Sequence, residues 1–231
     1  MKINLLTVCT EAYPIEYARK LITKVQQVSD LELVPYCITD RPKMIEAAGF
    51  ATPISNAPGV KSWWNKILLF NPNMPEGWNL YMDLDIVVQQ NFDEEIMWAI
   101  NNGFDDYITC VSDAIGWLGN SFSSSWMMFK TGTQTYIYDA FMKNIPEIQK
   151  DVGGDQVWIG KQMYPKTRYI DQVYPNLKKN LKFHLGKKNI VGDWCFPEHL
   201  DRNIKLVDCG GRPKPHDLDY LYYIKENWHN V

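Results

Sequence analysis

The chain has 231 residues, of which 45% are hydrophobic and 22% are charged, so it can bury a core without disulfides or structural metals. Its formal net charge of −3 excludes the general basic surface typical of nucleic-acid-binding proteins. An anionic ligand would therefore have to meet a local cluster of positive charge.

The cysteine count and the N-terminal sequence favour a cytoplasmic protein. The five cysteines form no C-x-x-C pair and are odd in number, which favours reduced thiols. The first residues, MKINLLTVCTE, carry too short an apolar run for a signal peptide. No apolar run approaches the roughly 20 residues of a membrane-spanning helix, so we expect no transmembrane segment.

The first part of the chain alternates between strand and helix patterns. Residues 2–9 are a continuous apolar run, which predicts a buried strand. In Ile15–Val28 the apolar residues recur at spacings of three and four, which predicts an amphipathic helix. A second strand is predicted at 31–39, a short helix at Pro42–Ala48 ending at Gly49, and a third strand at 51–54. This alternation predicts an α/β fold with a mostly parallel sheet, whose ligands bind beyond the carboxyl ends of the strands.

The rest of the chain continues with helices and strands and then becomes less regular. Helices are predicted at 61–70, 93–101, 133–143 and 154–163, and strands at 107–111 and 123–130, with a loop at 112–122. Asn91 or Asp93 could cap the helix at 93. After Pro165, short strands are predicted at 168–171, 181–184 and 205–207, followed by a helical aromatic segment at 218–228. No repeat and no linker divides the sequence, so we expect one domain, residues 1–231.

Two aspartates interrupt a strongly apolar stretch, residues 79–90 (NLYMDLDIVVQQ). On an extended strand, Asp83 and Asp85 would point to the same face, about 6–7 Å apart. At an effective dielectric of about 20, their charges would repel by roughly 2–3 kcal/mol. A cation between them would remove this cost, and carboxylate oxygens suit Mg²⁺ or Mn²⁺ bound together with a phosphate. Two solvated acids at a strand end are the alternative.

A late turn, residues 208–217 (DCGGRPKPHD), has the composition of a phosphate-binding loop. Gly210 and Gly211 permit close approach of the backbone to a ligand. Lys214 lies between two prolines, which present its charge stiffly, and a lysine beside a glycine turn suits a diphosphate. An exposed basic turn without a ligand is the alternative.

Four short motifs occur in order along almost the whole chain. They are the polar turn at 9–13 (CTEAY), the D-x-D of Asp83 and Asp85, the D-Q pair of Asp155 and Gln156, and the G-x-x-K-P at 211–215. This ordered set resembles the metal-dependent, nucleotide-sugar-using glycosyltransferases of the GT-A fold, particularly glycosyltransferase family 8 and its relatives. The resemblance implies a Rossmann-like, mostly parallel sheet flanked by helices. It also implies sugar transfer from a nucleoside-diphosphate sugar, with a UDP-sugar expected, to a hydroxyl of a carbohydrate or glycan acceptor.

The resemblance assigns the donor-binding residues. Thr10 and Tyr13 would contact the nucleoside, with Tyr13 against the base. Lys66 would lie in the helix beneath the donor. Gly211 and Lys214 would close over the phosphates.

The metal ligands follow from the same resemblance. Asp83 and Asp85 would hold Mn²⁺ or Mg²⁺ against the donor diphosphate. Family 8 has a His as third ligand three residues before the glycine of the late turn, and here that position is Asp208, itself a hard oxygen ligand. His216, just past the Lys-Pro pair, is the rival for this role.

The catalytic residues implied by the resemblance are Asp155 and Gln156, which would line the pocket for the sugar or the acceptor. Residues 123–127 stand where relatives carry an N-x-G strand touching the donor sugar, but Ser123 replaces the Asn. Residues 1–112 would form the nucleotide-binding half, and 113–231 the acceptor half with the phosphate-binding turn. No general base is assigned.

Two other functions are compatible with parts of the sequence. The run MDLDIV also fits the nucleophile strand of haloacid-dehalogenase-type phosphatases, with Asp83 as nucleophile. That family needs a later G-D-x-x-x-D, and neither Gly154-Asp155 nor Gly192-Asp193 has the second acid at that spacing. A non-catalytic nucleotide-sugar-binding module is the third interpretation.

Overall fold

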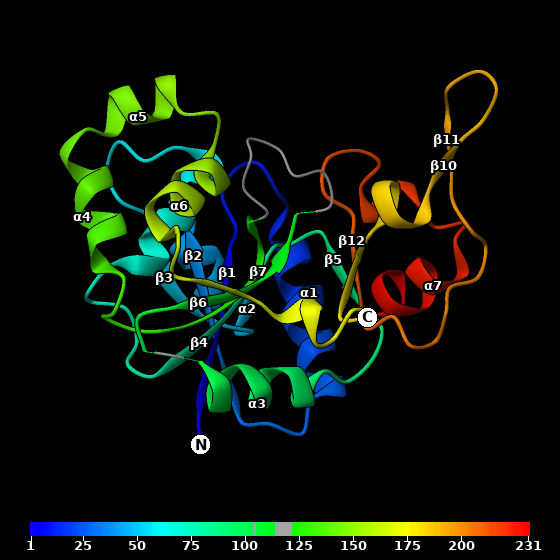
Figure 1. The fold of residues 1–231 in the computed structure, drawn as a ribbon, viewed down its shortest axis with the longest axis horizontal. Coiled ribbons are helices and arrows are strands. Elements are labelled where there is room, and N and C mark those ends of the chain that lie inside the picture. Colours follow the sequence, from blue (N-terminus) through cyan, green and yellow to red (C-terminus); the bar gives the residue numbers. More distant parts are fainter. Residues whose placement is uncertain (104, 114–121) are drawn as a thin grey trace.

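The computed structural model describes residues 1–103, 105–113 and 122–231. The largest sheet within these residues has seven strands in the order β3-β2-β1-β4-β7-β6-β8 (Figure 1). In that order the strands are β3 Thr52–Ser55, β2 Leu33–Thr39, β1 Ile3–Val8, β4 Trp78–Met82, β7 Phe122–Lys130, β6 Ile108–Ser112 and β8 Thr167–Tyr169. Strands β3, β2, β1 and β4 are parallel, β6 and β8 are parallel, and β7 is antiparallel to both of its neighbours. The predicted α/β class with a mostly parallel sheet is therefore confirmed.

The helical segments and the smaller strands complete the described chain. The helices are α1 Ile15–Val28, α2 Pro42–Ala48, the 3-10 helix η1 Ser62–Phe70, α3 Asp93–Asn102, α4 Thr135–Lys143, α5 Ile145–Asp151, α6 Asp155–Met163 and α7 Tyr222–Ile224. Short helical turns are η3 Ile170–Gln172, η4 Leu181–Leu185, η5 Pro215–Asp217 and η6 Lys225–His229. A small sheet has the order β5-β12-β9, with β5 Ile86–Val88, β12 Leu206–Asp208 and β9 Lys178–Asn180, and β10 Lys187–Lys188 pairs with β11 Trp194–Cys195.

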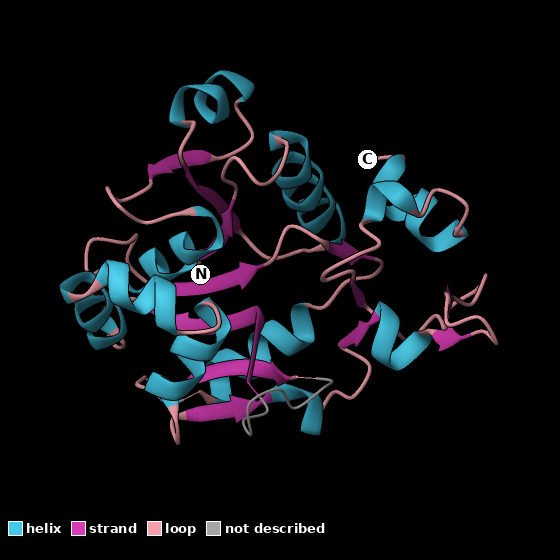
Figure 2. Cartoon of the chain, turned by 90° about the horizontal axis from the view of Figure 1, so that it is seen from above, coloured by secondary structure: helices cyan, strands magenta, loops and turns pink. Residues whose placement is uncertain are grey.

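Helices cover both faces of the main sheet (Figure 2). Successive side chains of a strand point to opposite faces, so neighbouring residues enter different cores. Leu5 of β1 packs in the core that includes α1, α3 and the C-terminal segment. Leu6 packs in the core that includes η1, α4 and α6. The apolar run of β1 is continuous because both of its faces are buried, as in other parallel sheets.

The D-x-D is not part of one long strand, contrary to the prediction for residues 79–90. Strand β4 ends at Met82, Asp83 and Asp85 lie in a turn, and β5 then enters the small sheet. The backbone N–H of Asp83 donates to Ser125 O at 2.9 Å in the main sheet, whereas Cys209 N–H donates to Asp85 O at 3.0 Å beside the small one. The prediction was wrong because the apolar residues on either side of the acids belong to two different sheets.

Some of the other predicted helix and strand bounds are confirmed, and others are wrong. Helices α1 and α2 have the predicted bounds, and Gly49 ends α2 in the left-handed conformation with φ +70°. The strand predicted at 181–184 is wrong, because the Asn180 side chain accepts hydrogen bonds from Lys182 N and Phe183 N and starts the turn η4. Helix α5 was not predicted. In the loop predicted at 112–122, residues 114–121 lie outside the described residues.

Two further predictions concern the helix near residue 93 and the C-terminal segment. The N-cap residue of α3 is Phe92, and Asn91, one of the two predicted capping residues, accepts at Oδ1 a hydrogen bond from Asp93 N at 2.9 Å. The carboxylate of Asp93 instead accepts hydrogen bonds from Ser29 Oγ at 2.6 Å and Asp30 N at 2.8 Å, which tie α3 to the end of α1. The predicted helical segment at 218–228 becomes helical at Tyr222.

The C-terminal segment packs beside α1 (Figure 1). Trp228 lies edge-on to Tyr17 of α1 with ring centroids 4.9 Å apart, and Lys20 Nζ donates to Trp228 O at 2.8 Å. None of the helices in the described residues combines the length and the apolar character that crossing a bilayer requires. Because the C-terminal segment packs on α1, the late glycine turn that precedes this segment in the chain lies near the end of β1.

Candidate active site

A cavity of about 430 Å³ opens at the carboxyl ends of β1 and β4. The chain runs outward from β1 to β2 and β3 and returns on the other side of β1 as β4. This is the point where the strand order reverses, and it is where open α/β sheets bind ligands. All ten residues predicted for the site line this cavity: Thr10, Tyr13, Lys66, Asp83, Asp85, Asp155, Gln156, Asp208, Gly211 and Lys214.

Lys66 bridges two of the acids. Its ammonium lies 2.9 Å from Asp83 Oδ1 and 2.9 Å from Asp155 Oδ2, and it donates to Ser124 Oγ at 3.0 Å. Tyr81 Oη donates to Asp83 Oδ1 as well. Burial alone would lower the pKa of Lys66, but Asp155 and Asp83 together raise this pKa above its ordinary value. Helix η1 thus supplies a permanent positive charge beneath the D-x-D turn.

Burial dominates the electrostatics of Asp83. Burial raises the pKa of Asp83, Lys66 opposes this rise, and the neighbouring carboxylate of Asp85 adds to it. An acid destabilised in its charged form gains from any additional cation nearby.

Lys214 contacts Asp85 and Tyr13 at the opposite side of the cavity. Its ammonium lies 2.5 Å from Asp85 Oδ2 and 4.9 Å from the centroid of the Tyr13 ring, and it donates to Tyr13 Oη. Tyr13 Oη in turn donates to Asp85 Oδ2 at 3.2 Å. Burial, followed by the charge of Asp85, raises the pKa of Tyr13 to about 12. The late turn and the first strand therefore meet at the D-x-D, as the motif order implied.

Asp208 is paired with a lysine that sequence reasoning missed. Lys178 Nζ lies 2.6 Å from Asp208 Oδ2, which also accepts from Ser125 Oγ at 3.1 Å, while Gly210 N–H donates to Asp208 Oδ1 at 2.8 Å. Burial would raise the pKa of Asp208, but Lys178 and the hydrogen bonds hold this pKa below its ordinary value. Lys178 stands between Leu177 and Lys179, and nothing in this local sequence marks it as a lysine that lines a site.

Asn180 and His184 also line the cavity, and neither was predicted. Asn180 N–H donates to His184 Nδ1 at 2.9 Å, so the neutral ring carries its proton on Nε2. Burial, then the charges of Lys179 and Lys178, lower the pKa of His184. The neutral ring can donate a hydrogen bond to a ligand hydroxyl or phosphate but cannot take a proton at Nε2.

The acids offer a partial metal site. Asp83 and Asp85 supply hard carboxylate oxygens, and Asp85 Oδ1 accepts no hydrogen bond from the described residues. No group of three His, Cys, Asp or Glu side chains in the described part of the chain is arranged to hold a metal ion. Such a donor set fits Mg²⁺ or Mn²⁺, which keep water and phosphate ligands, rather than a metal held by protein alone.

A second cavity of about 570 Å³ adjoins the first and shares Tyr13, Trp63 and Lys214 with it. His216 lines only this second cavity, where its Nδ1 is hydrogen-bonded to Tyr17 Oη and its Nε2 lies 3.3 Å from Asp217 Oδ1. The structure therefore does not bring His216 together with Asp83 and Asp85, whereas Asp208 does line their cavity.

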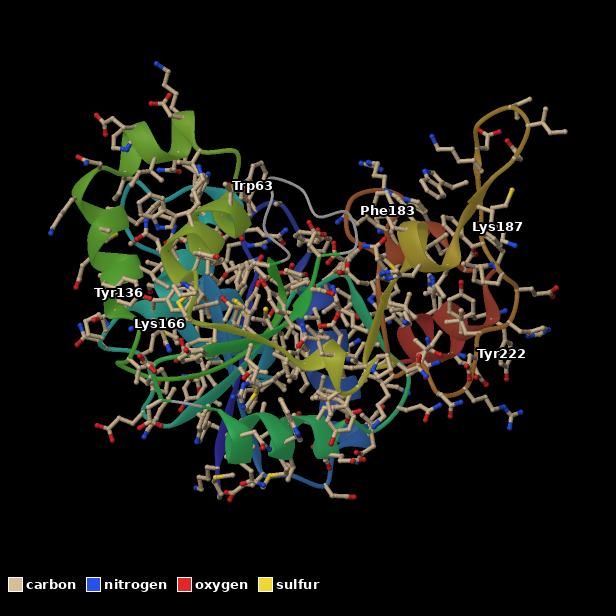
Figure 3. All side chains as sticks on the ribbon, in the orientation of Figure 1. Trp63, Tyr136, Lys166, Phe183, Lys187 and Tyr222 are labelled. Atoms are coloured by element: carbon tan, nitrogen blue, oxygen red, sulfur yellow. The ribbon has the colours of Figure 1, made fainter. Side chains whose placement is uncertain are left out.

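Two exposed aromatic side chains line the first cavity. Trp63 comes from η1 and is 60% exposed, and Phe183 comes from η4 and is 47% exposed. In the view of Figure 3 they lie on the same upper side of the molecule, one in each half of the chain. An exposed ring beside a polar cavity suits contact with the apolar face of a sugar.

Several solved structures share this architecture at low sequence identity. The galactosyltransferase LgtC in complex with donor and acceptor sugar analogs superimposes with a TM-score of 0.66 at 13% identity, covering 99% of this chain and 96% of its own. The chain has the GT-A fold. The glycosyltransferase GlyE of Streptococcus pneumoniae TIGR4 matches this GT-A chain with a TM-score of 0.63 at 13% identity, over 100% of this chain and 62% of GlyE. Mouse xyloside xylosyltransferase 1 matches with a TM-score of 0.52 at 13% identity, over 78% and 88%.

No protein-family model matches the sequence, and no curated protein sequence is close enough to count as a relative. The expected GT-A fold is confirmed by the solved structures over nearly the whole chain. These likenesses establish the fold, and the reaction must be argued from the cavity itself.

Proposed function

We propose that this GT-A chain is a glycosyltransferase that moves a sugar from a nucleoside-diphosphate sugar, with UDP as the expected nucleotide, to a hydroxyl of a carbohydrate acceptor. The observation that carries the proposal is the meeting of Asp83, Asp85 and Lys214 in one cavity at the reversal of strand order. A diphosphate needs cationic groups, and acids beside a lysine can bind it only when a divalent cation accompanies it. Asp83 and Asp85, with Asp208 as the proposed third ligand, would hold Mn²⁺ or Mg²⁺.

The glycine turn supports binding of the diphosphate. Gly211 has φ +80°, a conformation that side chains rarely adopt, and a Cβ there would meet Lys182 Nζ at 3.1 Å. A Cβ on Gly210 would lie 3.0 Å from Asp208 Oδ1. Both positions therefore keep the backbone of the turn open to a ligand, and Lys214 follows three residues after Gly211.

Stabilisation of the leaving group is the main catalytic contribution of these residues. As the bond between the sugar and the diphosphate breaks, negative charge grows on the nucleoside diphosphate. The Lys214 ammonium, whose side chain is 18% exposed, would stabilise this charge. A bound divalent cation would supply Lewis-acid stabilisation of the same charge.

Asp155 and Gln156 would orient the sugar or the acceptor. Gln156 Oε1 accepts a hydrogen bond from Ser124 N at 3.1 Å, which leaves its amide N–H groups for a ligand hydroxyl. Lys66 fixes the carboxylate of Asp155 at the wall of the cavity. Ser123 lines the cavity where the resemblance places a contact to the donor sugar.

Hydrolysis of the donor tests the proposal. A glycosyltransferase slowly hydrolyses its UDP-sugar when Mn²⁺ is present and stops when EDTA is added. A binding module would bind UDP without hydrolysis, and release of phosphate from an aryl phosphate would instead favour the phosphatase. The GT-A fold removes the structural basis for the phosphatase, whose family has a different strand arrangement. If no nucleotide sugar in a panel is bound or hydrolysed, the proposal is wrong.

A further inference from the structure

Each acid proposed to face the metal is already paired with its own lysine. The distances are 2.9 Å for Lys66 and Asp83, 2.5 Å for Lys214 and Asp85, and 2.6 Å for Lys178 and Asp208. With Asp113 and Asp155 added, five carboxylates and three ammonium groups line the cavity. Each of the three proposed metal ligands is nevertheless neutralised by its own lysine, which weakens its attraction for a free divalent cation.

The three lysines differ in their freedom to move. The side chains of Lys66 and Lys178 are 8% and 6% exposed. Each has further partners, since Lys66 donates to Ser124 and Lys178 donates to Ser125 at 2.7 Å. Lys214 also donates to Tyr13 Oη, but it is 18% exposed, lies on a turn, and borders both cavities. Among these lysines, Lys214 can leave its acid at the lowest cost.

Of the three acids, Asp85 also has the most free carboxylate oxygen with which to bind another cation. Asp83 and Asp208 use both of their carboxylate oxygens. Asp83 Oδ1 accepts from Tyr81 and Lys66, and Asp83 Oδ2 from Lys66 at 3.3 Å. Asp208 Oδ2 accepts from Ser125 and Lys178, and Asp208 Oδ1 from Gly210 N–H. Asp85 uses only Oδ2, for Lys214 and Tyr13. A cation that approaches Asp85 must therefore displace the Lys214 ammonium or share a carboxylate with it, and like charges oppose such sharing.

We infer that Lys214 is an exchangeable counter-ion, which pairs with Asp85 in the free protein and transfers to the diphosphate when a divalent cation takes Asp85. This inference rests on the proposed function, because it requires a diphosphate ligand. The cation and the nucleotide then bind as one unit: the diphosphate draws Lys214 away, and the vacated carboxylate receives the cation. Each ligand raises the affinity of the site for the other, as linkage requires.

Calorimetric titrations of Mn²⁺ alone, UDP alone and UDP with saturating Mn²⁺ test this exchange. In the unaltered protein, Mn²⁺ alone should bind weakly, and each ligand should tighten the other within the usual range of about 5–150-fold. In Lys214→Met, Mn²⁺ alone should bind about tenfold or more tightly, because Asp85 is free, while UDP with Mn²⁺ should bind more weakly. One substitution thus moves two affinities in opposite directions.

Lys182→Met is the matched control. Lys182 Nζ is near the same glycine turn, 3.1 Å from the position of a Cβ on Gly211, and its side chain makes no ion pair with a described carboxylate. Its removal should weaken UDP binding modestly and leave the affinity for Mn²⁺ alone unchanged. Lys214→Arg, which keeps the charge, should retain weak binding of Mn²⁺ alone even if Lys214→Met fails to fold.

The outcomes separate the exchange from the proposed function. If Lys214→Met binds Mn²⁺ no more tightly than the unaltered protein, or if Lys182→Met tightens Mn²⁺ binding equally, the exchange is wrong while the glycosyltransferase function stands. If Lys214→Arg binds Mn²⁺ alone tightly, the exchange is wrong as well. If the unaltered protein binds no UDP with or without Mn²⁺, the proposed function fails and the exchange fails with it.

Discussion

The Lys178 ammonium lies 2.6 Å from Asp208 Oδ2, and less than a tenth of either side chain is exposed. The pair joins β9 to the adjacent strand β12 of the small sheet and faces the cavity. A buried ion pair contributes little net stability, but loss of one member leaves an uncompensated charge. The pair is therefore sensitive to single substitutions and tolerant of a double one.

A double-mutant cycle should reveal this asymmetry. Lys178→Met should lower the free energy of unfolding by about 3–5 kcal/mol, because it leaves the buried charge of Asp208 without its partner. Lys178→Met combined with Asp208→Asn should recover most of that loss. Urea unfolding of the unaltered protein, both single variants and the double variant gives the coupling energy. Additive losses would show that the two charges are not paired.

The D-x-D turn should be required for binding of metal with nucleotide. Asp83→Asn and Asp85→Asn each remove a hard anionic ligand, so Mn²⁺-dependent binding of UDP should be lost in both variants. Because Lys66 keeps Asp155 as a partner and Lys214 is 18% exposed, loss of either acid leaves no fully buried unpaired charge, and circular dichroism should show an intact fold. Titration calorimetry with and without Mn²⁺ makes the measurement, and unchanged metal-linked affinity in both variants would overturn the assignment.

Lys214 should contribute more to the binding of UDP than to the binding of uridine. A hydrogen bond to a charged group contributes about 1.5–3 kcal/mol, so Lys214→Ala should raise the Kd for UDP by roughly 10–150-fold. The Kd for uridine should change much less, since uridine carries no phosphate. Equilibrium titrations with both ligands compare the two losses. Equal losses would place Lys214 away from the diphosphate.

Trp63 and Trp64 are adjacent but should behave in opposite ways. Trp63 is 60% exposed and follows Ser62, whose φ of +47° is unusual for a residue with a side chain. Trp64 is buried and stacks on Phe141 with ring centroids 5.4 Å apart. Trp64→Ala should lower the free energy of unfolding by about 3–5 kcal/mol, whereas Trp63→Ala should change it by less than about 0.5 kcal/mol.

The expected effect of Trp63→Ala is on ligand binding, as a raised KM for the acceptor sugar at unchanged stability. Denaturant unfolding and steady-state kinetics with varied acceptor separate the two properties. A variant with unaltered KM for both donor and acceptor would show that the exposed ring contacts neither.

Tyr17 should make stability depend on pH in the alkaline range. Burial is the main cause that raises the pKa of Tyr17 from 10.0 to about 12. Because the folded protein favours the neutral phenol, this contribution is complete below pH 10 and is lost as the pH rises towards 12. Tyr17→Phe also loses the hydrogen bond to His216, so it should be about 1 kcal/mol less stable at neutral pH. Urea unfolding from about pH 9 to about pH 11.5 should show the two stabilities converge and then cross, and parallel curves would contradict the prediction.

Much of the fold was predictable because its signals are local. Periodic apolar residues and the boundaries at Pro42 and Gly49 determine α1 and α2, which have the predicted bounds. The structure also brings the residues of the short motifs together, since all ten predicted site residues line one cavity. Their order in the sequence was informative because the carboxyl ends of neighbouring parallel strands meet at one edge.

The remaining features depend on contacts that a single sequence does not display. The break at Asp83 was missed because strands of two sheets are equally apolar, and the pairing partner of β5 comes more than a hundred residues later, in Leu206–Asp208. The Lys178–Asp208 pair spans 30 residues, and neither lysine content nor spacing distinguishes Lys178 from the solvent-exposed lysines near it. The turn η4 forms because Asn180 caps it, which overrides the strand propensity of residues 181–184.

The small sheet has a consequence for the order in which the protein matures during synthesis. Strand β4 and the two acids leave the ribosome early, but β12 and Lys214 leave only near the end. A nascent chain interrupted before Leu206 already contains all seven strands of the main sheet, whereas β5 still lacks its partner. Under the proposed function, competence for donor binding would then appear only late in translation, after β12 and Lys214 have been synthesised.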